Sequence, residues 1–165
     1  MPAKYNEPEL TQPVDLCDLQ GNLNPAAVGW SRHSLHFCNL KGHWPRKKRW
    51  NYWAVVSRDH LFSVTLSDVD YLGLPFIYLL DFNSKTFAEK TLLKPFAAGI
   101  DLLPAVEEDV VYTDPAMPIL MRHNEQGVQL KVGCPDFDGK PLALDLQVHI
   151  PEDHESLNVV IPWSE

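Results

Sequence analysis

The fold is decided by residues 127–150, which read GVQLKVGCPDFDGKPLALDLQVHI. Apolar and polar residues alternate along two runs of this stretch, with turn-forming residues at 136–139 between them. The alternating apolar positions are Val128, Leu130, Val132 and Cys134 in the first run, then Leu142, Leu144, Leu146, Val148 and Ile150 in the second. Because successive side chains of a strand point to opposite faces, each run predicts a strand with one buried face.

Runs of β-branched and aromatic residues, each ended by turn residues, extend in both directions from this stretch. They predict further strands at residues 50–57, 60–66, 71–82, 86–93, 110–113, 119–123 and 157–163. Short turns separate many of these runs and no strong helical pattern occurs, which favours an antiparallel meander. Closure would remove the free sheet edges of such a meander. We therefore predict an all-β fold in which residues 49–165 form an antiparallel barrel or half-barrel.

Residues 1–48 are rich in Pro, Asn and Gly and show no sustained period, so we expect an irregular N-terminal arm. Within it, Asn24 is a favourable N-cap residue and Pro25 suits the first helical position, which predicts one short helical turn. With 165 residues, the chain has the size of a single domain.

The predicted strand at 71–82 differs from the others because both of its faces are apolar. One face carries Leu74, Phe76, Tyr78 and Leu80, and the other carries Ile77 and Leu79. Such a strand needs a cover outside the sheet, which the N-terminal arm, a second copy of the chain or another domain would provide.

Composition excludes several classes of function. The chain is 45% hydrophobic and 22% charged, as ordinary globular proteins are, and its net charge of −8 disfavours nucleic-acid binding. No apolar run has membrane-spanning length. Three cysteines without paired spacing indicate neither a disulfide framework nor a zinc ribbon. With a polar opening, MPAKYNE, these features predict a cytoplasmic protein with free thiols.

A basic run enters an aromatic strand at residues 46–53, where the sequence is Arg46, Lys47, Lys48, Arg49, Trp50, Asn51, Tyr52 and Trp53. One interpretation is a solvated loop that protects a sheet edge. A second is an anion site with an aromatic wall, and a third is a targeting or nucleic-acid signal. Strand alternation places Lys48, Trp50 and Tyr52 on one face and Arg49, Asn51 and Trp53 on the other. If Trp53 points inward, Arg49 and Asn51 lie in the mouth of a barrel, where ligand-orienting groups are expected.

The sequence HESLN at 154–158 offers a second candidate site, with His154, Glu155 and Asn158 as candidate catalytic residues. The alternatives are a cluster that orders a turn and a set of ligand hydrogen bonds. The residues His33, His36, Cys38 and His43, with Cys17, have no compact zinc spacing, so we predict no metal site. Neither a Gly-rich phosphate loop nor a Gly-x-Ser-x-Gly elbow is present, and no cofactor is predicted.

Three blocks carry a resemblance to a known family: NPAAVGWSR at 24–32, KGHWPRKKRWNYW at 41–53 and HESLNVVIPW at 154–163. They resemble the family called domain of unknown function 2804. Members of that family are similar in general plan to lipocalin-like proteins with two β-barrel halves, a group that includes carotenoid hydratases. The family usually continues beyond the last block, so the resemblance implies that this chain corresponds to its N-terminal part, either as a short member of the family or as a product from which a C-terminal half is missing.

Three functional hypotheses follow from the residues and the resemblance. The first is a lipocalin-like barrel that binds an apolar small molecule with an anionic end, using residues 46–53. The second is a hydratase or isomerase in which His154 moves a proton, together with Glu155 or Asn158. The third is a structural or partner-binding domain, completed by a homodimer or by the missing half. The family name implies no reaction.

Overall fold

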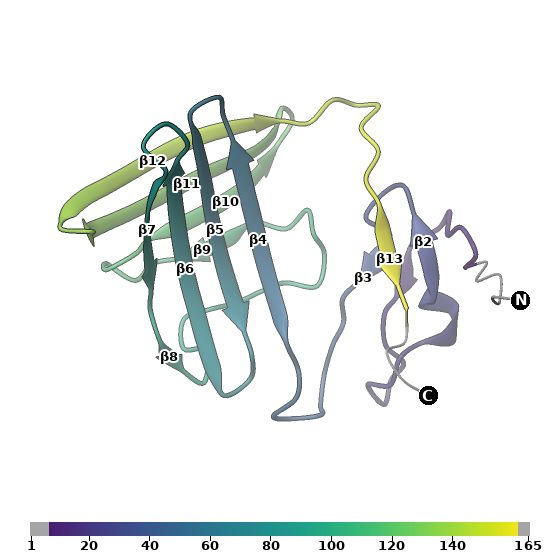
Figure 1. Ribbon diagram of the computed structural model, residues 1–165. Helices are drawn as coiled ribbons and strands as arrows, with labels where there is room; N and C mark the ends of the chain where they lie inside the picture. Colours follow the sequence, from purple (N-terminus) through teal and green to yellow (C-terminus); the bar gives the residue numbers. More distant parts are fainter. Residues whose placement is uncertain (1–6, 162–165) are drawn as a thin grey trace, which may run out of the picture. The chain divides into compact units, whose positions relative to one another are not determined.

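The computed structural model describes residues 7–161 and consists mainly of β-strands (Figure 1). It divides into two compact units. Within the described residues, unit 1 takes its members from Met1–Gly42, Leu103–Glu108 and Pro151–Glu165. Unit 2 comprises His43–Leu102 and Asp109–Ile150. No described helix has the length and apolar character that a membrane crossing requires.

The first sheet of unit 2 is an antiparallel meander. Its strands, in spatial order, are β4 (Arg49–Val56), β5 (His60–Asp68), β6 (Leu72–Asp81) and β7 (Thr86–Thr91). A short strand, β8 (Lys94–Pro95), also pairs with β6. Because these strands are consecutive and joined by short turns, each pairs with its neighbour in the chain. The four strands predicted between residues 50 and 93 are all present.

The second sheet of unit 2 is also an antiparallel meander. Its strands are β9 (Val110–Tyr112), β10 (Ile119–Asn124), β11 (Gly127–Phe137) and β12 (Lys140–His149). Asp138 and Gly139 form the turn between β11 and β12, and both have positive φ, 53° and 76°. This is the backbone geometry that favours Asp-Gly in a two-residue hairpin turn. A register shift between Cys134 and Phe137 marks a bulge beside this turn.

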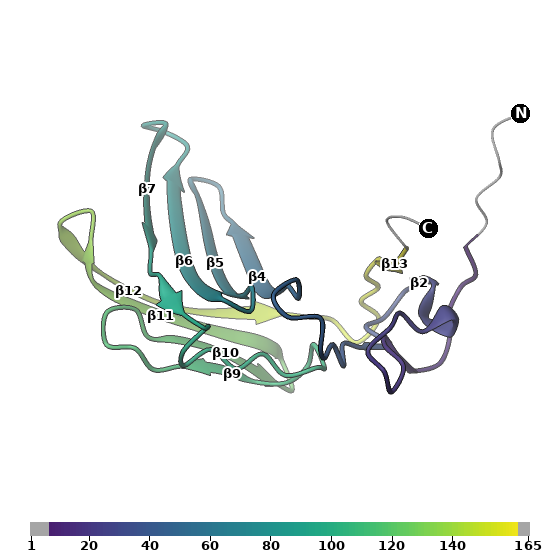
Figure 2. The ribbon, with the colours of Figure 1, turned by 90° about the horizontal axis from the view of Figure 1, so that it is seen from below.

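The core of unit 2 consists of alternate side chains from both sheets. Val64, Leu66 and Ile77 of the first sheet are completely buried, as are Val128 and Leu130 of the second. The inward leucines of β12 are half-buried at the margin of this core. Figure 2 shows the two sheets of unit 2 from a second direction. The all-β antiparallel meander is confirmed, while unit 2 forms two sheets rather than one closed barrel.

Unit 1 is built from short elements that lie far apart in the sequence. Its strands are β1 (Val14–Asp15), β2 (Gly29–Ser31), β3 (His36–Phe37) and β13 (Asn158–Val160), and its 3₁₀ turn is η1 (Pro25–Ala27). β1 pairs with β3 in parallel, and β2 pairs with β13 antiparallel. The side chain of Asn24 caps η1 by accepting a hydrogen bond from Ala26 N at 3.1 Å.

The last strand differs from the prediction of a strand at 157–163. It covers only Asn158–Val160, and residues 162 and 163 lie outside the described residues. It pairs with β2, in the segment expected to be an irregular arm, and not with the meander. The last hydrogen bond from this segment to the second sheet is that from Ile150 N to Gln126 O at 3.1 Å, directly before Pro151.

Candidate functional site

Strand β4 divides the predicted 46–53 site between two faces of the first sheet. Trp53 packs against the core of unit 2, and Arg49 and Asn51 are half-buried on the same face. Trp50 and Tyr52 point the other way and are 64% and 54% exposed. The eight residues therefore do not form one continuous site.

Lys47 takes part in the local structure. Its Nζ lies 3.1 Å from Asp70 Oδ1 and 3.5 Å from Asp68 Oδ2, and its backbone N–H donates to Asp70 Oδ2 at 3.0 Å. The Asp70 side chain is only 6% exposed, so removal of Lys47 would leave a buried carboxylate without its partner. Lys47 thus anchors the entry to β4 and is not available as a ligand clamp.

Arg46 and Lys48 are the exposed bases of the run. No ion pair involves either of them among residues 7–161. Lys48 directly precedes β4 and lies two positions before Trp50. An exposed base therefore comes immediately before the strand that carries the exposed rings of Trp50 and Tyr52.

The face of the first sheet that points away from the core, here the outer face, is mainly apolar. The strand registers place the following large side chains on it: Trp50, Tyr52, Val56, Leu61, Leu74, Phe76, Tyr78, Leu80 and Phe87. Val56 and Phe87, on its two edge strands, are 63% and 62% exposed. This is the side of β6 for which the sequence predicted a cover, and its edges are open to solvent.

The strand at the centre of the outer face, β5, carries smaller side chains than the strands on either side of it. β5 contributes the small residues Ser63, Thr65 and Ser67 between the aromatic residues of β4 and β6. Across the next strand pair, the rings of Tyr78 and Phe87 stack with centroids 5.5 Å apart and an interplanar angle of 24°. The face thus combines aromatic surfaces with hydroxyl groups.

A hollow of about 660 Å³ lies at the second sheet. Its exposed lining includes Val111, Ala143 and the ion pair of Lys131 with Asp145, which lie on the side away from the core. No sequence motif predicts this hollow, because the residues that line it come from separate strands. Gly133 helps to form it, since a Cβ there would come within 3.0 Å of Pro118 Cγ.

The 154–158 cluster lies in unit 1 and forms structural contacts. Glu155 Oε2 accepts a hydrogen bond from Arg32 Nη1 at 2.9 Å, and Arg32 Nε donates to Glu9 Oε1 at 3.0 Å. The hydrogen bond to Glu155, and then that to Glu9, raises the pKa of Arg32. Asn158 Nδ2 donates to Ser156 Oγ at 2.8 Å. Glu155 and Asn158 are therefore already engaged, His154 is exposed, and no proton relay connects the three. Their catalytic use stays a prediction.

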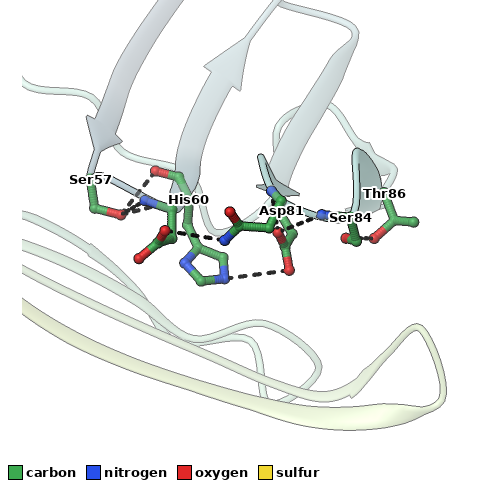
Figure 3. A network of polar contacts seen from close by, with 7 residues as sticks. Ser57, His60, Asp81, Ser84 and Thr86 are labelled. Atoms are coloured by element: carbon green, nitrogen blue, oxygen red, sulfur yellow. Dashed lines mark hydrogen bonds and ion pairs between the residues drawn. The ribbon is translucent and has the colours of Figure 1, made fainter.

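Figure 3 shows a polar network at the adjoining ends of the β4–β5 and β6–β7 hairpins, which the sequence analysis did not identify. It contains the residue types of a catalytic triad, since His60 Nε2 lies 3.9 Å from Asp81 Oδ2 and Ser57 is next to His60. However, Ser57 Oγ donates to the backbone oxygen of His60 at 3.2 Å and accepts from its backbone N–H at 3.0 Å. A serine bonded to the main chain, not to the imidazole, is not activated as a nucleophile.

Asp81 has an equally local role in this network. Its Oδ1 accepts the backbone N–H groups of Asn83 at 2.8 Å and Ser84 at 3.1 Å. These hydrogen bonds, chiefly that from Ser84, lower the pKa of Asp81. The network therefore orders two turns, and the short polar residues around them are typical of that role.

A third polar cluster is formed by Lys94, Asp114 and Tyr112 in unit 2. Lys94 Nζ donates to Asp114 Oδ2, and this contact lowers the pKa of Asp114 and raises that of Lys94. Tyr112 is 3% exposed, and its hydroxyl forms no hydrogen bond of normal geometry with a described residue. Burial, followed by the charge of Asp114, raises the pKa of Tyr112, so the phenol stays protonated.

Metal-ligand residue types do not converge in the described part of the chain. Among residues 7–161, no group of three or more His, Cys, Asp or Glu side chains is placed to hold a metal ion. The Nε2 atom of His36 contacts Ala27 O at 2.9 Å, and Cys17 is buried. The residues His33, His36, Cys38 and His43 thus form no metal centre in this structure.

The comparison with family models now decides the identity of the chain. Residues 7–165 match the family described as Domain of unknown function (DUF2804). The chain belongs to that family. Comparisons with curated proteins and with solved structures found no match. The DUF2804 match includes the whole of unit 2 and both segments that pair as β2 and β13. The lipocalin-like resemblance stays a prediction.

Proposed function

We propose that this DUF2804 protein binds an amphipathic small molecule, with an apolar body and an anionic end, on the outer face of β4–β7. The observation that carries the proposal is the exposure of Trp50 and Tyr52 on a strand that Lys48 directly precedes, since Lys48 is an exposed base without an ion-pair partner among the described residues. Exposed apolar patches on soluble proteins commonly mark binding surfaces. The space between the sheets is less suitable, because core side chains pack there.

The dimensions of the outer face favour a small molecule over a protein. From β4 to β7 the face spans three strand spacings, about 14 Å, and from Trp50 to Val56 about 20 Å. Its area is therefore roughly 300 Å², whereas each partner of a standard protein interface buries about 800 Å². A partner-binding domain remains the alternative hypothesis, and it would need additional surface.

Each part of the ligand has a matching group in this proposal. The apolar body lies against the rings of Trp50, Tyr52 and Phe76, which lose little conformational entropy on binding because aromatic side chains are stiff. The anionic end contacts Lys48 and Arg46 through charge-assisted hydrogen bonds. The partly exposed hydroxyls of Thr65 and Ser67 on β5 would contact polar atoms of the ligand, whereas Ser63 is buried.

The proposal also places the protein in the cytoplasm. Cys17 and Cys134 are buried thiols that form no disulfide with a described residue. Free thiols are usual in reducing compartments, which supports this placement.

Calorimetric titration of the purified chain with oleate tests the proposal. Oleate supplies both an apolar body and a carboxylate. We expect the double substitution Arg46→Gln and Lys48→Gln to weaken binding about a hundredfold, because two charge-assisted contacts are lost at roughly tenfold each. Trp50→Ser should weaken it independently by removing apolar area.

The matched control is the pair Arg58→Gln and Lys85→Gln. Arg58 and Lys85 are exposed at hairpin ends, and their substitution removes the same net charge from unit 2 as the test pair does. Lys47 is kept in every variant, because it supports Asp70. The proposal is wrong if oleate does not bind, or if the control pair weakens binding as much as the test pair does.

A further inference from the structure

The edge strand β12 is open to pairing with another strand. β12 is the terminal strand of the second sheet, and its neighbour there is β11 (Figure 1). It has ten residues, whereas β9, at the opposite end of the sheet, has three. An edge of this length presents a row of backbone donors and acceptors that can template a further strand.

The direction of these backbone groups follows from one hydrogen bond. Ile150 N donates to Gln126 O at 3.1 Å, on the β11 side. Because backbone groups alternate sides along a strand, the even-numbered residues of β12 face β11 and the odd-numbered residues face the open edge. The groups at the open edge therefore belong to Ala143, Asp145, Gln147 and His149. Pro141 is also odd-numbered, and its missing N–H ends the usable edge.

The side chains of β12 also favour the addition of a strand at this edge. Leu142, Leu144, Leu146 and Val148 face the core but are only half-buried, because they lie at its margin. A strand added at this edge, with apolar residues at alternate positions, would cover the margin while it paired the backbone.

Edge protection differs between the two sheets. The β4 edge is entered through four consecutive bases, a common device against unwanted pairing. Between Ala143 and His149, β12 has one charged residue, Asp145, and Lys131 Nζ neutralises it at 3.0 Å. Unit 2, which carries this edge, has twelve acidic and eleven basic residues, so the repulsion between two full chains of net charge −8 comes mainly from unit 1 and is reduced by salt.

We infer that β12 pairs antiparallel with β12 of a second copy of the chain, about a twofold axis at Leu146. Odd-numbered residues must face odd-numbered residues for both backbones to bond. With Leu146 opposite its own counterpart, Asp145 faces Gln147 of the second copy and Ala143 faces His149. Pro141 then lies outside the pairing, and four bonded residue pairs supply about eight backbone hydrogen bonds. The leucines of both copies continue one apolar face, and no like charges are opposed.

Sedimentation equilibrium of the full chain and two variants at one exposed position tests this inference. In Gln147→Glu, two like-charge pairs with Asp145 arise across the axis, whereas Gln147→Lys creates two opposite-charge pairs. We expect the dimer of Gln147→Glu to dissociate roughly tenfold more readily than that of Gln147→Lys. The difference should shrink at high salt. A monomer at all concentrations, or equal dissociation constants for the two variants, would overturn the inference.

Cysteine cross-linking tests the register separately. Leu146→Cys places two thiols opposite each other at a non-hydrogen-bonded pair, where the backbones approach closely. Leu144→Cys does not oppose itself, has Val132 as its partner on β11, and serves as the matched control. Disulfide-linked dimers of Leu146→Cys but not of Leu144→Cys are expected, and the reverse result would overturn the register. The surface is separate from the outer face, so oleate binding by the Gln147 variants should not change.

Discussion

Units 1 and 2 of the same chain are held together by different forces. Unit 2 buries large apolar side chains from two sheets, and its acidic and basic residues nearly balance. The fully buried residues of unit 1 within the described chain are small, namely Cys17, Gly21, Ala27, Gly29 and Ser31. Unit 1 has ten acidic and three basic residues, which account for most of the net charge of −8. The difference shows that a segment with little apolar core can be ordered by specific polar contacts.

The largest expected effect is in the core of unit 2. Leu130 is completely buried, so Leu130→Ala should lower the free energy of unfolding by about 2–5 kcal/mol through lost burial and a residual cavity. Urea unfolding followed by circular dichroism measures the change. Leu19→Ala is the control in unit 1, where the side chain is 84% exposed, and should have almost no effect. Equal decreases in the free energy of unfolding for Leu130→Ala and Leu19→Ala would contradict the difference between the two units.

A smaller effect is expected from a polar contact of unit 1. Asn39 Oδ1 accepts from Cys17 N at 2.8 Å, and Asn39 Nδ2 donates to Cys17 O at 3.0 Å. Asn39→Ala leaves both backbone groups without these bonds, at a cost of about 1–2 kcal/mol. Amide hydrogen exchange should show faster exchange in unit 1 with unit 2 unchanged. Faster exchange throughout both units would show that they unfold together.

The third prediction concerns the contribution of the Lys94–Asp114 ion pair to the stability of unit 2. The hydrogen bond with Lys94 lowers the pKa of Asp114 below the ordinary value of 3.8. The contact therefore stabilises the fold above this pH, and the contribution is lost as the pH falls through the lowered value. Asp114→Asn should reduce the melting temperature at pH 7, by less than Leu130→Ala does. The difference from wild type should shrink as the pH falls below 3.8, and a constant difference from pH 7 to pH 2 would refute the assignment.

The smallest effect is expected at Arg32, which is half-exposed between Glu9 and Glu155. Arg32→Gln removes two ion pairs and the contact of the guanidinium with the Trp30 ring at 5.3 Å. Solvent screens such pairs, so the melting temperature should fall slightly at low salt and less at high salt. Faster exchange of the Ser156 amide, which donates to Arg32 O at 2.8 Å, would locate the effect in unit 1. A larger decrease in melting temperature at high salt than at low salt would exclude an ionic origin of the effect.

The sequence predicts unit 2 well because its structure follows local patterns. The alternation from Val128 to Cys134 identifies β11, and the turn at Asp138 and Gly139 identifies its pairing with β12. The pairing of β2 with β13 has no such signal. Ser31 faces Asn158 across 127 positions, and only three residues of each strand take part. Neither the strand propensity of these residues nor the period of their hydrophobicity carries information about a pairing between such distant segments.

The candidate site shows the same limit. Alternation correctly assigns Trp50 and Trp53 to opposite faces of the sheet, because they lie three positions apart on one strand. It does not show that Lys47 binds Asp70, because that contact depends on how the segment before β4 passes the turn between β5 and β6. Residues of the run of four bases therefore differ in their surroundings although they are chemically alike, since Lys47 pairs with Asp70 whereas Arg46 and Lys48 are exposed.

The pairing of β2 with β13 also sets the order in which the chain can fold during synthesis. The β11–β12 hairpin closes through a two-residue turn and can form soon after its residues leave the ribosome. Residues 29–31 emerge early but must wait for residues 158–160, after the whole of unit 2 has been made. Unit 1 is therefore expected to assemble last. Until then its early segments depend on other protection, such as a chaperone, against premature contacts.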